Sequence, residues 1–491
     1  MIRSVEAIRP GTFEPESHFY LQSLNAAIHP TVSDFFHLSL EQIIQRHLQT
    51  NPRVDGAVLR HVLTYQPRFL HWAGTDLFHV TNGEGVRDMM VLETNSSPSG
   101  QKSMPLLDEH DPQGSYRTLV EQVLAPCVKA HSFRAGALAV LYDKNYVEAS
   151  GYAAALADCF HEPVYLIPYH ADTPDPAAYF QDGILQLRTA EGRCQPIRAA
   201  LRYVTQKPWT RIPLHTRTLI MNPLIACLAG GRNKSSAAKA YEACNERLLG
   251  SGLAINLPKT VRNVTKAEVP SIVREFGGYA VVKVPYTNCG QGVFTITNEV
   301  ELQRFIQTQL NYDRVIVQAL IGHRCWTSGG PAGGRYHVGT VPDASGRIYV
   351  ADLRFMVGAT QSGFKPLALF ARRARLPLAD KLSAGHTSWD MLGTNLSLKH
   401  GADEWSTDDG RLIPVDRKGF NRLGLSLDSL IQAYVQSVLA SVAIDEMACS
   451  LQGTNETLCL KKLAALCEDE QLLREISQGQ ENTTRAVPSA A

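Results

Sequence analysis

A glutamate and an asparagine stand two residues apart in VLETNSSPSG, residues 91–100. On a strand, Glu93 and Asn95 would project from one face, because side chains alternate between the two faces of a sheet. Carboxylate and amide oxygens are hard ligands that suit Mg²⁺. Asp76, at the start of an earlier apolar run, is the third candidate ligand. The alternative is a hairpin with solvated polar ends, since Asn-Ser-Ser-Pro-Ser-Gly is good turn chemistry without a metal.

Lys283 is the second feature of chemical interest, because it interrupts the apolar strand pattern GGYAVVKVPY. A buried lysine needs a partner, since an unpaired ammonium is costly to bury. The turn that follows, TNCGQG at 287–292, contains Gly290 and Gly292, whose backbone N–H groups can wrap phosphate oxygens. The lysine and the glycine turn together indicate a triphosphate site. The alternative is an edge-strand lysine beside an ordinary hairpin, because short glycine motifs often match by chance.

Lys234, in the helical stretch AGGRNKSSAAKAYEACNERLL, is a weaker candidate. The segment GGRNKSS lacks the spacing of a P-loop. A lysine near a helix start is more often a solvated surface residue, and only a family resemblance would make it a phosphate ligand.

Arginines supply the remaining candidates. Asp352 and Arg354 share one face of the strand pattern RIYVADLRFMVG, where the alternative is an exposed pair worth under about 1 kcal/mol. Arg372, Arg373 and Arg375, in LFARRARLPL, are either a solvated basic face or a grip for an anion. Arginine is the side chain best shaped to hold phosphate or carboxylate with two parallel hydrogen bonds.

These residues need strands to bring them together. In TDLFHVTNGEGVRDMMVLETN two apolar runs flank Asn82-Gly83, which predicts a hairpin. Its register would place Asp76 near Glu93 and Asn95, so that three oxygen ligands converge. Before the hairpin, Ser39 is predicted to cap a helix through a capping box.

From about residue 106 the pattern becomes strand, amphipathic helix and strand, with the strands at 137–142 and 163–168. This is half of an open α/β domain, and without G-x-G-x-x-G after its first strand it is not expected to bind a dinucleotide. We expect it to hold a substrate or to support a neighbouring domain. Later segments predict a helix at 299–309, a strand in RVIVQAL, and a disordered polar tail from residue 479.

The composition of the 491 residues indicates a globular chain whose 44% hydrophobic content can bury a sizeable core. The net charge of +1 gives no reason to expect nucleic acid or an anionic membrane as partner. Ten cysteines without a C-x-x-C pair argue against a zinc cage and fit a reducing cytoplasm. The N-terminus has no apolar signal region, and no run of about 18 apolar residues occurs, so we expect a cytoplasmic protein.

With these motifs in place, the chain resembles the ATP-grasp superfamily of carboxylate–amine ligases. VVKVPYTNCGQGV is similar to that family's lysine strand and glycine-rich lid, VIVQALI to its adenine-hinge strand, and DLRFMVG to its Asp-x-Arg strand. ARRA followed by TNLS resembles its later arginine and asparagine positions. WAGTDLFHV and VLETNSSPSG are similar to the closing pair of strands that hold Mg²⁺, but here that pair comes first.

The resemblance spans about residues 70–420 and implies a circularly permuted α/β (α+β ATP-grasp) fold with an inserted open α/β domain. Permutation is tolerated where termini lie exposed and close together. Residues 1–105 would carry the permuted part with the metal-binding strands, 106–215 a pre-ATP-grasp-like domain, 216–445 the remaining ATP-grasp subdomains with the lid and the Asp-x-Arg strand, and 446–491 a C-terminal helix and a disordered tail.

The resemblance also assigns roles. The nucleotide-binding residues would be Lys234, Lys283, Gly290, Gln291, Gly292, Gln318 and Leu320, the last two in the hinge. The ligands of Mg²⁺ or Mn²⁺ would be Asp76, Glu93 and Asn95, and the catalytic residues Arg354, Arg373 and Asn395. Gln318 stands where an acidic residue is common, and no ribose-binding carboxylate is identified. Cys289 has no role, because the chemistry needs no protein nucleophile.

The implied reaction joins an amino-acid-like carboxylate to the amine of an amino acid or peptide through an acyl phosphate, with release of ADP and phosphate. ETNSSPSGQKSMP, ARRARLPL and LIPVDRKGFNRLG are most similar to peptide ligases of the pheganomycin type. One alternative is an ATP-grasp small-molecule kinase, and another is a non-catalytic ATP-binding scaffold. The expected partners are small carboxylates and amines or peptides, and a homodimer is left open.

Overall fold

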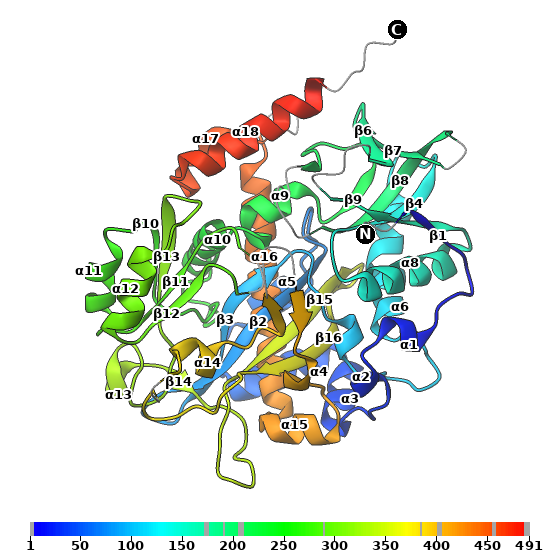
Figure 1. Ribbon diagram of the computed structural model, residues 1–491. Coiled ribbons are helices and arrows are strands. Elements are labelled where there is room, and N and C mark those ends of the chain that lie inside the picture. Colours follow the sequence, from blue (N-terminus) through cyan, green and yellow to red (C-terminus); the bar gives the residue numbers. More distant parts are fainter. Residues whose placement is uncertain are drawn as a thin grey trace.

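The computed structural model describes residues 4–170, 176–189, 192–204, 211–287, 290–382, 385–399, 405–453 and 458–485. Figure 1 shows three large sheets arranged around a central helix, with the N-terminal strands β2 and β3 lying beside the later strands β15 and β16. The predicted α/β fold class is confirmed, because a mixed sheet with parallel strands and antiparallel sheets are both present, together with many helices.

The central sheet has six strands in antiparallel pairs. Its strands are β2 (Trp72–Thr81), β3 (Arg87–Asn95), β14 (Tyr336–His337), β15 (Ala351–Thr360), β16 (Gly363–Arg373) and β19 (Leu412–Ile413). The register between β2 and β3 shifts after Asp76, so that Leu92 has no partner across the pair and forms a bulge. The predicted hairpin is confirmed, but its loop spans residues 82–86 and Gly85, with φ of +81°, takes the left-handed position.

A four-stranded antiparallel sheet faces one side of this region, on the left in Figure 1. Its strands are β10 (Thr260–Thr265), β11 (Ala280–Lys283), β12 (Val293–Ile296) and β13 (Arg314–Ala319), and its helices are α11 (Val269–Glu275) and α12 (Glu299–Gln307). The predicted helix at 299–309 and strand RVIVQAL are confirmed to within two residues. Asn298 explains the helix start, because its side chain accepts a hydrogen bond from the Glu301 N–H.

The seven-stranded sheet is the predicted open α/β unit, in which β5, β4, β8 and β9 run parallel. Its strands are β1 (Glu6–Ile8), β4 (Ala137–Tyr142), β5 (Val164–Pro168), β6 (Ala178–Gln181), β7 (Ile184–Arg188), β8 (Cys194–Tyr203) and β9 (Leu219–Met221). Helices α1 (Pro15–His18), α2 (Leu21–Leu24), α6 (Ser115–Leu119), η2 (Val120–Leu124), α7 (Ala125–Ala130) and α8 (Tyr146–Phe160) accompany it. Because β1 pairs with β5, the first strand belongs to this unit and not with the metal-strand segment to which 1–105 was assigned.

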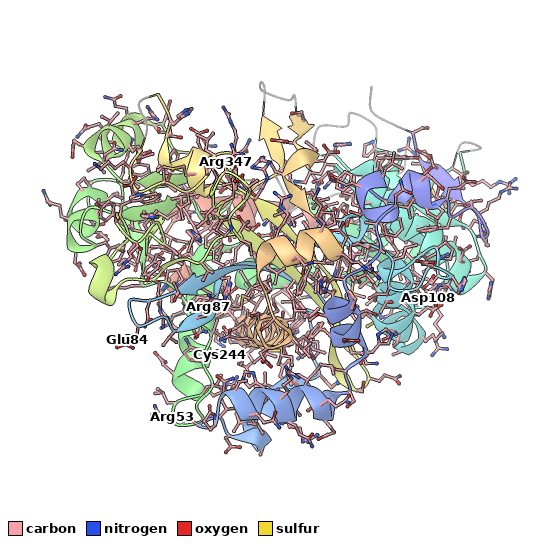
Figure 2. All side chains as sticks on the ribbon, turned by 90° about the horizontal axis from the view of Figure 1, so that it is seen from below. Arg53, Glu84, Arg87, Asp108, Cys244 and Arg347 are labelled. Carbon is pink, nitrogen blue, oxygen red and sulfur yellow. The ribbon has the colours of Figure 1, made fainter. Side chains whose placement is uncertain are left out.

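Helix α16 (Leu427–Leu451) runs through the centre of the molecule, and Figure 2 views it nearly along its axis among packed side chains. By length and apolar composition it could span a membrane, but 78% of its most apolar window is buried inside the protein, as in a core helix. Its Asp445, fully buried, accepts hydrogen bonds from the backbone N–H groups of Arg68, Phe69 and Leu70. The core helix thereby fixes the chain at the entry to β2.

The remaining helices are α3 (Pro30–His37), α4 (Leu40–Thr50), α5 (Gly56–Leu63), α9 (Leu224–Ala226), α10 (Lys234–Arg247), α13 (Gly330–Gly333), α14 (Ser388–Leu392), α15 (Arg417–Leu423), α17 (Leu460–Leu466) and α18 (Glu470–Arg485). Short turns η1 (Gln101–Ser103), η4 (Cys227–Gly231) and η5 (Asp409–Arg411), with strands β17 (Ser397–Lys399) and β18 (Trp405–Thr407), complete the fold. The predicted capping box of Ser39 is confirmed. The prediction of disorder from residue 479 is wrong up to Arg485, where α18 ends, and residues 486–491 lie outside the described residues.

Candidate functional site

A row of charged residues crosses three strands of the central sheet. Glu93 on β3 lies directly opposite Asp76 on β2, and Asp76 lies opposite Arg354 on β15. The Arg354 guanidinium donates from Nε and Nη2 to the two Asp76 oxygens at 2.6 and 2.7 Å. Arg372 on β16 pairs with Asp352 and also lies 3.0 Å from Asp76 Oδ2. The result is a continuous buried ion-pair network on the face that carries Glu93.

Electrostatics in this network keep Asp76 ionised. Burial alone would raise the pKa of its carboxyl, but Arg354 and Arg372 together lower it to about 2. Burial likewise opposes the charge on Arg372, yet Asp352 and Asp76 raise the pKa of its guanidinium above the ordinary value. The four charged groups therefore stabilise one another in a site that is otherwise costly for any single charge.

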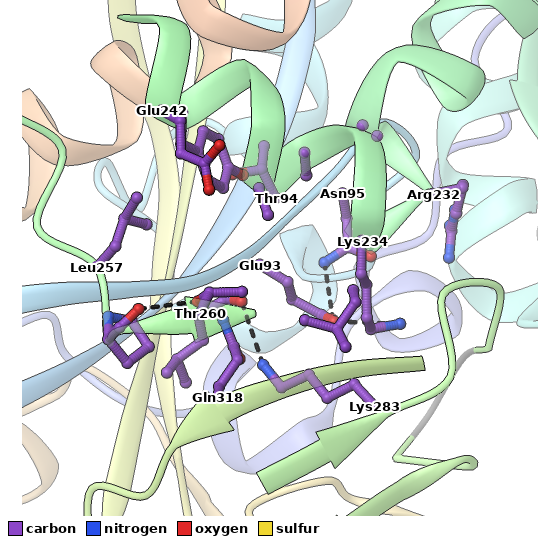
Figure 3. A pocket seen from close by; sticks show the side chains of 18 of the residues that line it. Glu93, Thr94, Asn95, Arg232, Lys234, Glu242, Leu257, Thr260, Lys283 and Gln318 are labelled. Carbon is purple, nitrogen blue, oxygen red and sulfur yellow. Dashed lines mark hydrogen bonds and ion pairs between the residues drawn. The ribbon is translucent and has the colours of Figure 1, made fainter. Parts of the chain in front are cut away.

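Glu93 faces a cavity together with two lysines, as Figure 3 shows. Its Oε2 lies 3.6 Å from Lys234 Nζ, and its Oε1 accepts a hydrogen bond of 3.3 Å from Asn95 Nδ2. The side chain is 33% exposed, unlike that of Asp76 at 6%. Burial raises the pKa of the Glu93 carboxyl, but Lys234 and Lys283 outweigh it, so the pKa lies below its usual value. This carboxylate is thus charged and accessible.

Lys283 reaches the same cavity from the four-stranded sheet. Its Nζ donates to the Leu92 carbonyl at 3.4 Å, across 191 residues of sequence. That carbonyl belongs to the bulged residue of β3, which has no residue opposite it on β2. Burial, reinforced by Lys234 and opposed by Glu93, lowers the pKa of the Lys283 ammonium to about 8. An anion placed beside it would relieve this penalty.

Lys234 is the first residue of α10, so the expected position near a helix start is confirmed. The Asn233 side chain caps the helix by accepting from the Ser235 and Ser236 N–H groups. The Ser96 N–H donates to the Gly231 carbonyl at 3.0 Å, which ties the helix start to the end of β3. This tie explains why Lys234 lies beside Glu93.

The predicted lid connects β11 to β12. Gly290 and Gly292 have φ values of +73° and +64°, in the left-handed region that favours glycine. Lys234 holds the loop, because its Nζ donates to the Thr287 carbonyl at 2.8 Å. Asn395 lies against Gly290, where an added Cβ would be 2.4 Å from its Nδ2. Residues 288 and 289, which include Cys289, lie outside the described residues.

The two predicted hinge residues, Gln318 and Leu320, both line the site, but their polar groups are not equally available to a ligand. The Gln318 side chain lines it and donates to Thr260 Oγ1 at 2.9 Å. The Leu320 side chain also lines it, but the Leu320 N–H already donates to Ser328 Oγ and its carbonyl accepts from Thr327 Oγ1. The expectation that Leu320 binds a ligand is therefore limited to apolar contact. Phe78, Val281 and Leu392 extend this apolar wall, which suits a flat ring.

The structure separates Arg373 from the site. Successive residues of a strand point to opposite faces, so Arg372 enters the ion-pair network while Arg373 turns away. The Arg373 guanidinium stacks 4.7 Å from the Tyr349 ring and donates to the Ala374 carbonyl. The prediction that Arg373 lies at the site is wrong in this structure, because Arg373 lines none of the site's cavities, whereas Arg372 lines two of them. A search for the arginine that shares a face of the sheet with Asp352 and could pair with it would have pointed to Arg372.

Three cavities of about 230, 120 and 930 Å³, which share lining residues, form the site. Glu93 and Thr287 line all three. The smallest lies between the central and four-stranded sheets, over Asp352 and Arg372. The largest extends to the open α/β unit, past Arg354 and the loop after β3. The site can accept an elongated polyanion at one end and a larger molecule at the other.

The oxygen donors present fit a Mg²⁺ ion only in part. Within the described ranges, no three His, Cys, Asp or Glu side chains cluster as a metal site. Glu93 and Asn95 face the cavity side by side, which confirms their predicted common face. Mg²⁺ is usually held by one or two carboxylates together with substrate phosphates, and this pair meets that need. Asp76 is held by ion pairs with Arg354 and Arg372. It would have to release Arg354 before its carboxylate could bind a metal ion.

Glu148 of α8 is a buried residue that the sequence reasoning missed. It accepts hydrogen bonds from the Ser99 hydroxyl, the backbone N–H groups of Gly100 and Gln101, and the hydroxyls of Tyr152 and Tyr203. It thereby holds the loop after β3 against the open α/β unit. A glutamate near the start of the alanine-rich stretch YVEASGYAAALADCF, whose other carboxylate is Asp158, is the signal that was available.

Solved structures similar to this chain include three ATP-grasp or related proteins. A RimK-domain ATP-grasp protein from Sphaerobacter thermophilus is 14% identical, covers 61% of this chain and 98% of its own, and has a TM-score of 0.28. A glutathione synthetase-like effector from Globodera pallida is 9% identical, with 71% and 86% covered and a TM-score of 0.39. The ATP-grasp ligase PsnB with a minimal precursor is 12% identical, with 62% and 99% covered and a TM-score of 0.26.

No protein-family model and no curated protein matches the chain. The expected resemblance to ATP-grasp proteins reappears among solved structures, but at TM-scores this low nothing about the reaction follows from it.

Proposed function

We propose that this chain is an ATP-dependent carboxylate–amine ligase with a circularly permuted ATP-grasp fold. The observation that supports it most directly is the convergence of Glu93, Lys234 and Lys283 on one cavity between two antiparallel sheets. Two lysines and a carboxylate, with an amide oxygen beside it, are what a metal-bound triphosphate requires. The early position of β2 and β3 in the chain is what a permutation would produce.

Each end of the site has a part in this proposal. Lys234 and Lys283 would bind phosphate oxygens, and Glu93 and Asn95 would hold Mg²⁺ or Mn²⁺, which neutralises negative charge during phosphoryl transfer. The apolar wall of Phe78, Val281, Leu320 and Leu392 would contact the base. The lid at Gly290 and Gly292 would exclude water from a reactive acyl phosphate.

A carboxylate is a poor acyl donor because its leaving group would be oxide. Phosphorylation by ATP would convert it to an acyl phosphate, and an amine would then attack the carbon and expel phosphate. Arg354 and Arg372 line the largest cavity and would orient the carboxylate and stabilise the oxyanion of the tetrahedral state, a contribution of typically about 3 kcal/mol. Asn395, beside the lid, would help to position the lid. The proposed reaction requires no nucleophilic side chain from the described residues.

An ADP-release screen over pairs of amino acids and peptides, with mass detection of the products, tests this function. Free phosphate together with an amide product supports ligation. A phosphorylated product would instead identify a small-molecule kinase that uses the same nucleotide end. ATP binding without turnover on any pair would favour a scaffold, against which the retained lysines and metal ligands argue.

A further inference from the structure

The largest cavity ends at a distinctive place in the open α/β unit. Lys144 and Asn145, which follow β4, line this end together with Tyr203, the last residue of β8. Strand β4 lies between β5 and β8, so the strand order departs from β4 in both directions. In open sheets of parallel strands, ligands bind outside the carboxyl ends of the strands at such a switch point. The fold thus presents a crevice continuous with the nucleotide end.

Basic side chains dominate this far end of the cavity. Lys102, Lys144 and Arg232 line it, whereas Glu93 is the single carboxylate among the described lining residues and lies beside Lys234 and Lys283. Arg354 and Arg372 line the part between the two ends and are engaged by Asp76. Lys102 and Lys144 line only the largest cavity, whereas Arg232 also lines the cavity that contains Lys234 and Lys283.

Two further carboxylates, Glu148 and Asp143, lie near these cations, and both already accept hydrogen bonds from other groups of the protein. Glu148 is fully buried and accepts five hydrogen bonds, and its Oε2 forms an ion pair with Lys102 Nζ at 3.9 Å. Asp143 is 4% exposed and accepts from Arg211 at 2.9 Å. They moderate the positive charge but do not line the cavity among its described residues.

Described contacts hold two of the three cations in place. Lys102 is buried and lies 4.9 Å from the centre of the Tyr20 ring, and Arg232 donates to the Ser97 carbonyl at 3.0 Å. Burial is the main reason that the pKa of Arg232 lies below its usual value, so an added anion would be favourable there. Preorganised cations beside a crevice suit a charged ligand group better than a neutral one.

We propose that this cluster of Lys102, Lys144 and Arg232 binds a second anionic group of the substrate, a carboxylate or a phosphate, distinct from the carboxylate that reacts. This inference rests on the proposed function, and it names the substrate class as an acidic amino acid derivative or acidic peptide. The reacting carboxylate lies near Arg354 and Arg372, while the second anionic group anchors the same molecule, or the amine partner, at the switch point.

Titration calorimetry on the full chain tests the inference with three dipeptides, Gly-Glu, Gly-phosphoserine and Gly-Gln. Mg²⁺ and a non-hydrolysable ATP analogue are present, so that the nucleotide end is filled. We expect one anionic dipeptide to bind about tenfold more tightly than Gly-Gln, and the tighter of the two identifies the anion. In about 1 M NaCl, where the Debye length is roughly 3 Å, this preference should shrink.

Lys144→Glu should abolish the preference, because it reverses a charge that lines the crevice. Lys365→Glu is the matched control, since Lys365 is an exposed lysine on β16 that lines none of the three cavities. Equal affinity of the three dipeptides, or a preference unchanged in Lys144→Glu, would overturn the inference. Failure of the ATP analogue to bind in the same titration would count against the proposed function alone, because the dipeptide comparison does not depend on turnover.

Discussion

The carboxylate of Asp76 is held by the guanidinium of Arg354 through two parallel hydrogen bonds of 2.6 and 2.7 Å. The two residues lie directly opposite each other on β2 and β15 and are nearly buried. Glu93, opposite Asp76 on its other side, is the accessible carboxylate. Asp76 and Glu93, which were predicted as equivalent metal ligands, thus have different surroundings and should respond differently to mutation.

Asp76→Asn should destabilise the protein strongly. Removing this carboxylate leaves Arg354 without its charged partner and Arg372 with only Asp352, and breaking a buried ion pair costs roughly 3–5 kcal/mol. Denaturant unfolding would measure the loss. Glu41→Gln, which breaks an exposed pair with Arg60, is the control and should leave the unfolding free energy nearly unchanged. Equal stabilities of the two variants would contradict the importance of the network.

Glu93→Ala should abolish ADP release while leaving the protein folded. The side chain is one-third exposed, and its partners Lys234 and Lys283 reach a cavity where water can approach them. Under the proposed function we expect kcat to fall by roughly 10²-fold or more, since the variant lacks a carboxylate that would hold the metal ion. Circular dichroism and the unfolding midpoint check the fold. Full activity would remove Glu93 from the site.

Arg372→Lys and Arg373→Lys should have opposite outcomes. Lysine cannot reproduce the paired hydrogen bonds of Arg372 to Asp352, so kcat/KM should fall by roughly 10²-fold. Arg373 points to Tyr349, and its replacement should leave kcat/KM within about twofold. Steady-state kinetics on the two neighbouring variants separates them, and a larger loss in Arg373→Lys would restore the sequence-based assignment.

ATP binding should weaken as the pH rises through about 8. The pKa of the Lys283 ammonium is lowered to about 8, so the group loses its positive charge above that pH and attracts phosphate less strongly. The affinity for a non-hydrolysable ATP analogue should therefore fall between about pH 7 and pH 9. Lys283→Arg keeps its charge throughout this range, and its affinity should vary less. A pH profile shared by both proteins would show that another group titrates.

Gly290→Ala should impair the lid. An added Cβ would lie 2.4 Å from Asn395 Nδ2, at a backbone φ of +73°. We expect the KM for ATP to rise between about tenfold and a hundredfold, because small displacements of binding loops are costly to catalysis. Gly277→Ala controls for backbone strain, since Gly277 has a φ of +80° with nothing within 4 Å of an added Cβ. Similar kinetics in both variants would argue against contact with Asn395.

Local patterns predicted the elements and the accessible part of the site. Alternating polarity located the β2–β3 hairpin, a capping box located α4, and an oxygen pair with period two placed Glu93 and Asn95 on one face. The lysine in an apolar strand, Lys283, faces the cavity as its rarity there indicated. These signals are local, and local signals survive in any tertiary arrangement.

Long-range partners were beyond the same reasoning. Which of two adjacent arginines faces the site depends on the register of β16 against β15, and a shift of one residue exchanges their faces. The engagement of Asp76 by Arg354 and the five-fold acceptance of hydrogen bonds by Glu148 likewise join segments far apart in sequence. The extension of α18 into the polar tail, as far as Arg485, was missed because composition alone favoured disorder there.

The pairing of β2 with β15 has a consequence for protein synthesis. Arg354 leaves the ribosome 278 residues after Asp76, which at roughly 5–20 residues per second is a delay of about 15 to 55 seconds. Throughout that interval the β2–β3 hairpin has an unpaired edge, a lone carboxylate and no core helix α16 to pack against. The nascent N-terminal hairpin is therefore the segment where chaperones would engage the growing chain, and where premature termination would leave an aggregation-prone fragment.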